Sequence, residues 1–306
     1  MFSPSEQNLS EAEEALYNII VPENQKEAIN MDDFTDLYGA EAIARDKAYL
    51  EKRERNFEEG DETEASKKAG RLFEAIVNRG VREINLMGPR AMPIVPSRYD
   101  DVARGIDSII QFKGERGATS HIALGIDVSR STMGLSKKFS NIIKSVKSGE
   151  LSTAKYFKTK NFRGEFGPVV RVVIGADKPI AESITDLLLR EIRMRETIAK
   201  NRARNDESES AKALPKEFAK NRTALAEHPL QWVVLFEMKE QLEAFRDYAT
   251  RIGKEQVADE CAKILHIIDG IIEDKKAAGQ FIDNVTIEED EMFRLIRKEI
   301  EIINGL

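Results

Sequence analysis

The chain has 306 residues, of which 33% are charged and 41% hydrophobic, and its formal net charge is −7. This length allows one large domain or a few smaller modules, each able to bury a core. No apolar run approaches the roughly 20 residues of a membrane span, and the N-terminus lacks the basic stretch of a signal peptide. We therefore expect a cytoplasmic protein with no membrane contact. A single cysteine, Cys261, excludes an intramolecular disulfide.

The charge is unevenly distributed along the chain. Residues 1–60 carry 6 basic and 15 acidic side chains, residues 61–178 carry 21 and 13, and residues 179–306 carry 20 and 26. Only the middle segment is basic, and residues 128–171 contain ten basic and only two acidic side chains. Such a stripe is typical of a surface that contacts a phosphate backbone, although a solvated lysine-rich face has the same composition.

The first half of the chain begins with helical periodicity over residues 9–20 and 31–59. A third helix is predicted over residues 62–80, capped by Asp61 or Thr63 and ended by Gly80. Its predicted buried face consists of Ala69, Leu72, Phe73, Ile76 and Val77. A short strand is expected over residues 82–87, and the proline-rich residues 88–101 are expected to form a loop.

From residue 105 onward strand patterns replace helical ones, and after Pro179 the chain becomes helical again. We expect strands over residues 105–112, 121–129, 153–157 and 169–175, with a helix over 137–149. The later helices are predicted near 180–203, 230–252, 254–278 and 287–303, and the polar residues 201–217 are expected to be irregular. The chain therefore reads as an α/β protein with an acidic helical segment (1–60), an α/β core (61–178) and a helical region (179–306).

The tripeptide Gly-Ile-Asp occurs in both of the first two strands after residue 104. If these strands form an antiparallel hairpin, one face stays apolar when paired residue numbers sum to 234, so that Ile110 meets Leu124. The same register places Asp107 opposite Asp127. Two like charges at that distance are destabilising unless something compensates them. A divalent cation such as Mg²⁺, a basic side chain, a shared proton or divergence into water would each do so.

This order of elements, with an acid on the second strand and another on the third, resembles the core of the PD-(D/E)XK nucleases, an αβββαβ fold with a mixed sheet. The resemblance covers about residues 61–160 and implies that Asp107 and Asp127 bind Mg²⁺ and that Glu74 assists from the preceding helix. Where that family has a catalytic lysine this chain has Ser129, so the resemblance requires Lys137 or Lys138 to replace it.

Other assignments of the acids are open. Asp100 or Asp101 is an alternative first acid, which either binds metal or caps a turn. The segment around Asp127 also matches the first strand of a ribonuclease H-like or actin-like fold. That fold continues with a β-hairpin, whereas here a helix is expected from about residue 136.

The basic loop near residue 160 interleaves cations with aromatic side chains, as single-strand binders do. Lys155, Lys158, Lys160 and Arg163 are the predicted nucleic-acid contacts, whereas Phe157 is expected in the core. The leading hypothesis is a Mg²⁺-dependent nuclease. A catalytically degenerate module that binds nucleic acid or protein is the first alternative, and an assembly protein is the second. The apolar stripes of the C-terminal helices predict a bundle, or a surface for a protein partner.

Overall fold

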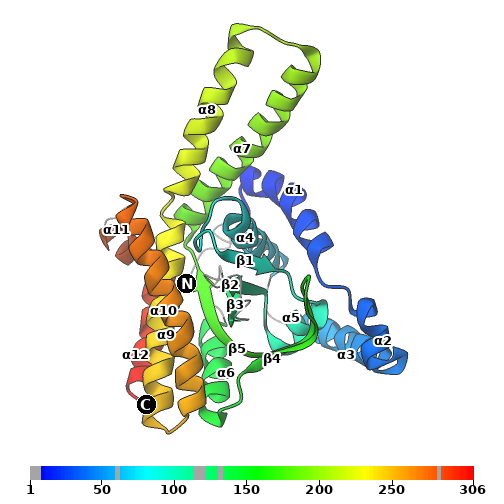
Figure 1. Ribbon diagram of the computed structural model, residues 1–306, viewed down its shortest axis with the longest axis vertical. Coiled ribbons are helices and arrows are strands. Elements are labelled where there is room, and N and C mark those ends of the chain that lie inside the picture. Colours follow the sequence, from blue (N-terminus) through cyan, green and yellow to red (C-terminus); the bar gives the residue numbers. More distant parts are fainter. Residues whose placement is uncertain (1–7, 59–62, 113–121, 130–133, 281–283) are drawn as a thin grey trace.

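The computed structural model describes residues 8–58, 63–112, 122–129, 134–280 and 284–306 (Figure 1). Within these ranges the side chains of residues 56–58, 122–124, 126–129 and 284–286 are not described. The chain forms a mixed α/β structure in which helices predominate around one sheet. No described helix is both long enough and apolar enough to span a membrane.

The elements follow one another in four groups. The N-terminal helices are α1 (Glu11–Glu27), the 3-10 helix η2 (Met31–Phe34), α2 (Thr35–Tyr38), α3 (Ala40–Glu58) and α4 (Glu64–Glu83). Next come β1 (Ala91–Ile94), α5 (Arg98–Arg104), β2 (Ser108–Phe112) and β3 (Ile122–Ser129). They are followed by α6 (Leu135–Ser148), β4 (Ser152–Lys158) and β5 (Arg163–Gly175). The C-terminal helices are α7 (Lys178–Arg204), α8 (Glu209–Ala226), α9 (Leu230–Arg251), α10 (Glu255–Ala277), α11 (Asn284–Glu289) and α12 (Glu291–Asn304).

The five strands form one sheet in the order β1-β2-β3-β5-β4. The β2–β3 pair is antiparallel, with Ser108 opposite Ile126, Ile110 opposite Leu124 and Phe112 opposite Ile122, which confirms the register deduced from the sequence. The chain then crosses over through α6 and β4, and β5 returns parallel to β3. The other three pairs of neighbouring strands are antiparallel.

Helix α4 begins where the sequence predicted, because the side chain of Thr63 accepts a hydrogen bond from the Ser66 amide. All five side chains of its predicted inner face are buried. The helix continues to Glu83, however, and the strand expected over residues 82–87 is wrong. The strand lies instead at Ala91–Ile94, inside the stretch expected to be a loop. Pro93 is tolerated there because β1 is an edge strand, where a missing amide donor breaks no central ladder.

One hydrophobic cluster joins α1, α4, the sheet, α6, α7, α9, α10 and α12. It contains Leu16 from the N-terminal segment, Ile110 and Val172 from the sheet, and Trp232 and Phe245 from α9. Since all three predicted segments contribute to it, the boundaries at residues 60 and 178 do not separate independent cores.

The C-terminal half of β5 has a strand neighbour on one side only, and α9 takes the place of the other. The Gln241 carboxamide accepts a hydrogen bond from the Val173 amide at 2.9 Å and donates one to the Val173 carbonyl at 2.6 Å. One turn earlier, Glu237 accepts from the Gly175 amide at 2.9 Å. Both side chains are fully buried, so α9 satisfies polar groups of β5 that water does not reach.

A smaller cluster packs residues 31–50 against β4 and α5, with the fully buried ring of Tyr156 at its centre. In Figure 1, α2 and α3 lie beside these elements, far from α9 and α10. The acidic N-terminal segment therefore covers part of the core that it was expected only to flank.

Helices α7 and α8 form a hairpin that projects from the body of the molecule (Figure 1). The sequence predicted an irregular segment over residues 201–217, and this is wrong because α8 begins at Glu209, capped by Ser208. The polar composition reflects exposure of the projecting helices rather than absence of structure.

Candidate functional site

The two aspartates of the predicted pair lie on neighbouring segments of backbone. Asp127 lies in β3, where its parallel partner is Val173 of β5. Asp107 lies in a bend directly before β2, and the β2–β3 ladder ends with Ser108 opposite Ile126. The two residues therefore occupy the next positions along the same register. The side chains of Asp127 and Ser129 lie outside the described part of the chain.

A chain of hydrogen bonds connects Glu74 of α4 with the start of β2. The Asn24 side-chain amide donates to Glu74 Oε1 at 3.0 Å, and Asn78 donates to Asn24 Oδ1 at 3.0 Å. The Ser108 hydroxyl then donates to Asn78 Oδ1 at 2.6 Å. Because Ser108 follows Asp107 directly, the network ties the predicted helix glutamate to the predicted first acid. Neither asparagine could be recognised from the sequence, where the i, i+4 spacing of Glu74 and Asn78 is the one available signal.

The Glu74 carboxyl is unusually basic in this position. Burial and, to a smaller extent, the negative charge of Asp101 raise its pKa to about 8, against the opposing effects of Asn24, Arg98 and Arg71. Asp101 itself forms an ion pair with Arg98. The negative charge of Asp101 therefore adds to burial in favouring the protonated form of Glu74.

Asp100 has a structural role, which removes it from the alternative metal ligands. Its carboxylate accepts hydrogen bonds from the Lys155 amide at 2.6 Å and the Tyr156 amide at 3.0 Å, both in β4. The Ser97 hydroxyl donates a third bond at 2.7 Å. The residue is fully buried, so its carboxylate fastens α5 to β4.

Arg171 of β5 extends across the sheet toward the segment that precedes Asp107. Its paired residue in β3 is Gly125, where an added Cβ would approach Arg171 Cγ to 3.1 Å. An added Cβ at Gly105 would lie 2.7 Å from the guanidinium nitrogen Nη2. The glycines of both Gly-Ile-Asp tripeptides therefore leave room for one arginine, a role that the sequence did not reveal.

The predicted nucleic-acid contacts are largely engaged by the N-terminal segment. Lys155 Nζ lies 2.5 Å from Asp46 Oδ2 and beside the rings of three tyrosines. Lys158 pairs with Asp33 at 2.7 Å, and Arg163 pairs with Asp36. Lys160 is exposed. Phe157 is fully buried, as the sequence predicted.

The two candidate substitutes for the missing lysine lie in the first turn of α6. Lys137 is exposed and Lys138 is half-buried. Across the described ranges, no group of three or more histidine, cysteine, aspartate or glutamate side chains is arranged to hold a metal ion. No protein-family model, curated protein or solved structure matches the chain.

Proposed function

We propose that this protein acts on nucleic acid through a core of the PD-(D/E)XK nuclease type, with phosphodiester hydrolysis dependent on Mg²⁺. The observation that carries the proposal is the register of β2 and β3, which brings the backbones of Asp107 and Asp127 to adjacent positions. The parallel pairing of β3 with β5 and the position of Glu74 on the preceding helix also support it.

The donor chemistry of the cluster suits a hard cation. Asp107, Asp127 and Glu74 carry carboxyl groups, whose oxygens are the ligands that Mg²⁺ prefers. Burial raises the pKa of Glu74 to about 8, so a bound cation would displace the proton of this carboxyl at neutral pH. Such a cation, when bound, polarises a phosphate and activates water. The residues of this protein would orient the nucleic-acid strand and hold the three acidic side chains in place. Arg171 supplies a permanent positive charge near Asp107, which partly replaces the lysine absent at Ser129.

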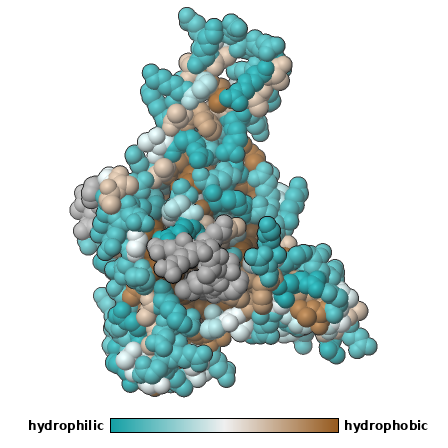
Figure 2. Space-filling model, in the orientation of Figure 1, coloured by the Kyte–Doolittle hydropathy of each residue, from teal (hydrophilic) through white to brown (hydrophobic). Residues whose placement is uncertain are grey.

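The nucleic-acid surface of this proposal is the arm formed by α7 and α8. Four exposed cations of α7 recur at three- to seven-residue steps along one helix face, and three of α8 recur every fourth residue. They are Arg190, Arg193, Lys200 and Arg204 in α7 and Lys212, Lys216 and Lys220 in α8. Figure 2 shows that the visible face of the arm is mainly hydrophilic. Two of these seven cations are paired, Lys200 with Glu196 at 4.0 Å and Lys212 with Glu207 at 3.6 Å. In residues 155–163, three of the four predicted contacts are paired.

The cleavage test uses labelled single- and double-stranded DNA and RNA, with Mg²⁺ or with EDTA. We expect cleavage with Mg²⁺ that EDTA and Asp127→Asn each abolish, while Asp259→Asn, a change at an exposed acid of α10, leaves it intact. Cleavage that persists in Asp127→Asn would refute the assignment of the site.

The binding test measures affinity for DNA as a function of salt. Replacing the four α7 cations by glutamine should lower the slope of log K against log[salt] by about 3 to 4, since each phosphate contact contributes about 0.9. The control replaces four exposed lysines elsewhere, Lys26, Lys52, Lys276 and Lys298. An equal loss in the control would show that only overall charge matters and would remove the arm from the proposal.

A catalytically degenerate version of the same module is the second candidate. Ser129 favours it, because a hydroxyl cannot supply the charge of the motif lysine. Salt-dependent binding without cleavage would favour this candidate over the nuclease.

A further inference from the structure

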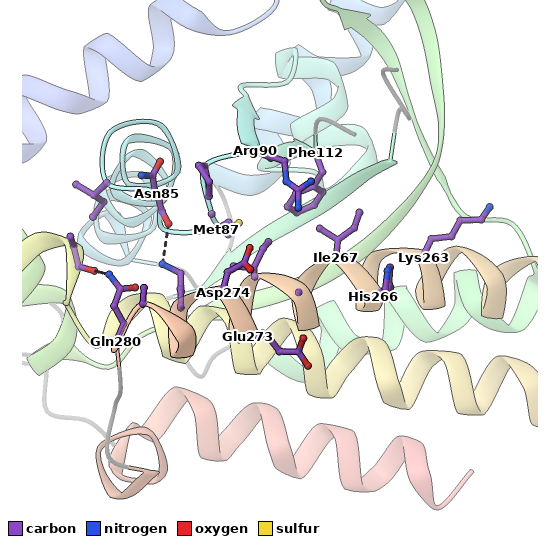
Figure 3. Close-up of a pocket in the computed structure, with 18 residues that line it drawn as sticks. Asn85, Met87, Arg90, Phe112, Lys263, His266, Ile267, Glu273, Asp274 and Gln280 are labelled. Atoms are coloured by element: carbon purple, nitrogen blue, oxygen red, sulfur yellow. Dashed lines mark hydrogen bonds between the residues drawn. The ribbon is translucent and has the colours of Figure 1, made fainter. Parts of the chain in front are cut away.

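A cavity of about 700 Å³ lies between α10 and the segment that joins α4 to β1 (Figure 3). One wall consists of residues 84–90 together with Phe112 at the end of β2. The opposite wall is formed by α10, from Lys263 to Lys275, and by Ala278 directly after the helix. This volume falls within the range of small-molecule pockets, about 300–1,000 Å³.

Apolar side chains and a glycine line the middle of the cavity. Met87 and Phe112 lie across from Ile267, as Figure 3 shows. Gly270 lies one turn after His266 in the middle of α10, and a Cβ added there would meet nothing within 4 Å. A glycine inside a helix costs about 0.5–1 kcal/mol relative to alanine. The chain therefore keeps space at a position where a larger residue would both fit and favour the helix.

One end of the cavity contains a buried amino group, that of Lys275, with two neutral hydrogen-bond partners. Lys275 Nζ donates to the Asn85 carbonyl at 3.2 Å and to Gln231 Oε1 at 2.5 Å, and both acceptors are neutral. Among the residues that the structure describes, no carboxylate forms an ion pair with it. An ammonium group has three donors, so one remains for a ligand. Burial lowers the pKa of Lys275 to about 8, so the amine is still largely charged at neutral pH.

The charges around the cavity also favour an anion. Arg90 and Lys263 line it in addition to Lys275. Two acids also line the cavity. Figure 3 shows Glu273 pointing away from residues 84–90 and Asp274 on the side of α10 that faces them, so the three cations outnumber the acids on the cavity side.

We propose that this cavity binds an amphipathic organic monoanion, with an apolar chain or ring along the Gly270 face and a carboxylate bonded to Lys275. The carboxylate provides a counter-charge that no carboxylate within the described ranges supplies to this amine by an ion pair. The apolar body fills the space between Met87, Phe112 and Ile267. This site is separate from the nucleic-acid proposal and does not depend on it.

The test uses decanoate as the probe and decan-1-ol as its neutral counterpart. Each is titrated into the full-length protein while the thermal unfolding midpoint is followed, because a ligand that binds only the folded state raises it. We expect decanoate to raise the midpoint in a saturable manner and decan-1-ol to raise it much less. Equal effects of the two, or no effect of decanoate, would overturn the proposal.

Two variants localise the binding. Gly270→Leu fills the cavity and should abolish the decanoate shift, whereas Gly70→Leu in α4, another helical glycine with open space around it, should leave the shift unchanged. Lys275→Met keeps the apolar bulk and should remove the preference for decanoate over decan-1-ol. If Lys275→Met does not fold, the comparison of Gly270→Leu with Gly70→Leu still tests the proposal. A decanoate shift of unchanged size in Gly270→Leu would show that decanoate binds elsewhere.

Discussion

Replacing Gln241 by leucine tests whether α9 truly substitutes for a strand beside β5. The change retains an apolar side chain of similar size but removes both hydrogen bonds to the backbone of Val173. The amide and carbonyl of Val173 then lie in a region without water, since Gln241 and Val173 are both fully buried. Each buried polar group left without a partner costs about 1–3 kcal/mol, which gives a predicted loss of about 2–6 kcal/mol.

This loss is a large part of the about 5–15 kcal/mol by which folded domains are stable. The assay is urea denaturation followed by circular dichroism, with Gln25→Leu, an exposed glutamine in α1, as the control. The control should change the free energy of unfolding by no more than about 0.5 kcal/mol. A loss below about 1 kcal/mol for Gln241→Leu, with an unchanged denaturant slope, would show that β5 does not depend on these bonds.

Three further predictions follow from the buried polar groups. Asp100→Ala should lower the free energy of unfolding by about 2–4 kcal/mol, because two backbone amides of β4 lose their hydrogen-bond acceptor. A loss no larger than that caused by replacing an exposed aspartate with alanine would contradict this role. The pKa of Glu74 is raised in the folded protein to about 8, so the folded state binds more protons than the unfolded state, and the free energy of unfolding should fall as pH rises from about 4.5 to 8. Urea titrations at successive pH values should show that Glu74→Gln flattens this part of the stability profile. Burial lowers the pKa of His228 to about 4, so the unfolded state is protonated first and the free energy of unfolding should fall as pH drops from about 6.5 to 4. An equal fall in the free energy of unfolding of His228→Gln would rule out this histidine as the cause.

Local patterns in the sequence were sufficient for the central strands. The alternation of apolar residues in β2 and β3 determines which faces can be buried, and that alone identified the pairing of Ile110 with Leu124. The buried face of α4 followed from helical periodicity in the same way. The strand at residues 91–94 was missed because proline normally argues against a strand, and only its place at the sheet edge permits it.

The contacts of the basic loop could not be deduced from the sequence, because the partners are far apart in the chain. Lys158 pairs with Asp33 across 125 residues, and Tyr156 bonds to Asp46 across 110. Composition indicated a basic middle segment and an acidic N-terminal segment, but not that one covers the other. The cavity beside Lys275 could not be predicted for the same reason, since its two walls come from residues 84–90 and from α10, which are far apart in the chain.

The long sequence separation of these N-terminal contacts has a consequence for synthesis of the chain. Residues 31–50 emerge from the ribosome more than 100 residues before Tyr156, around whose ring they pack. At about 5–20 residues per second, they wait several seconds or longer for their partner strand. Until then Phe34 and Leu50 lack Tyr156 as a packing partner, so chaperones are expected to bind this segment of the nascent chain.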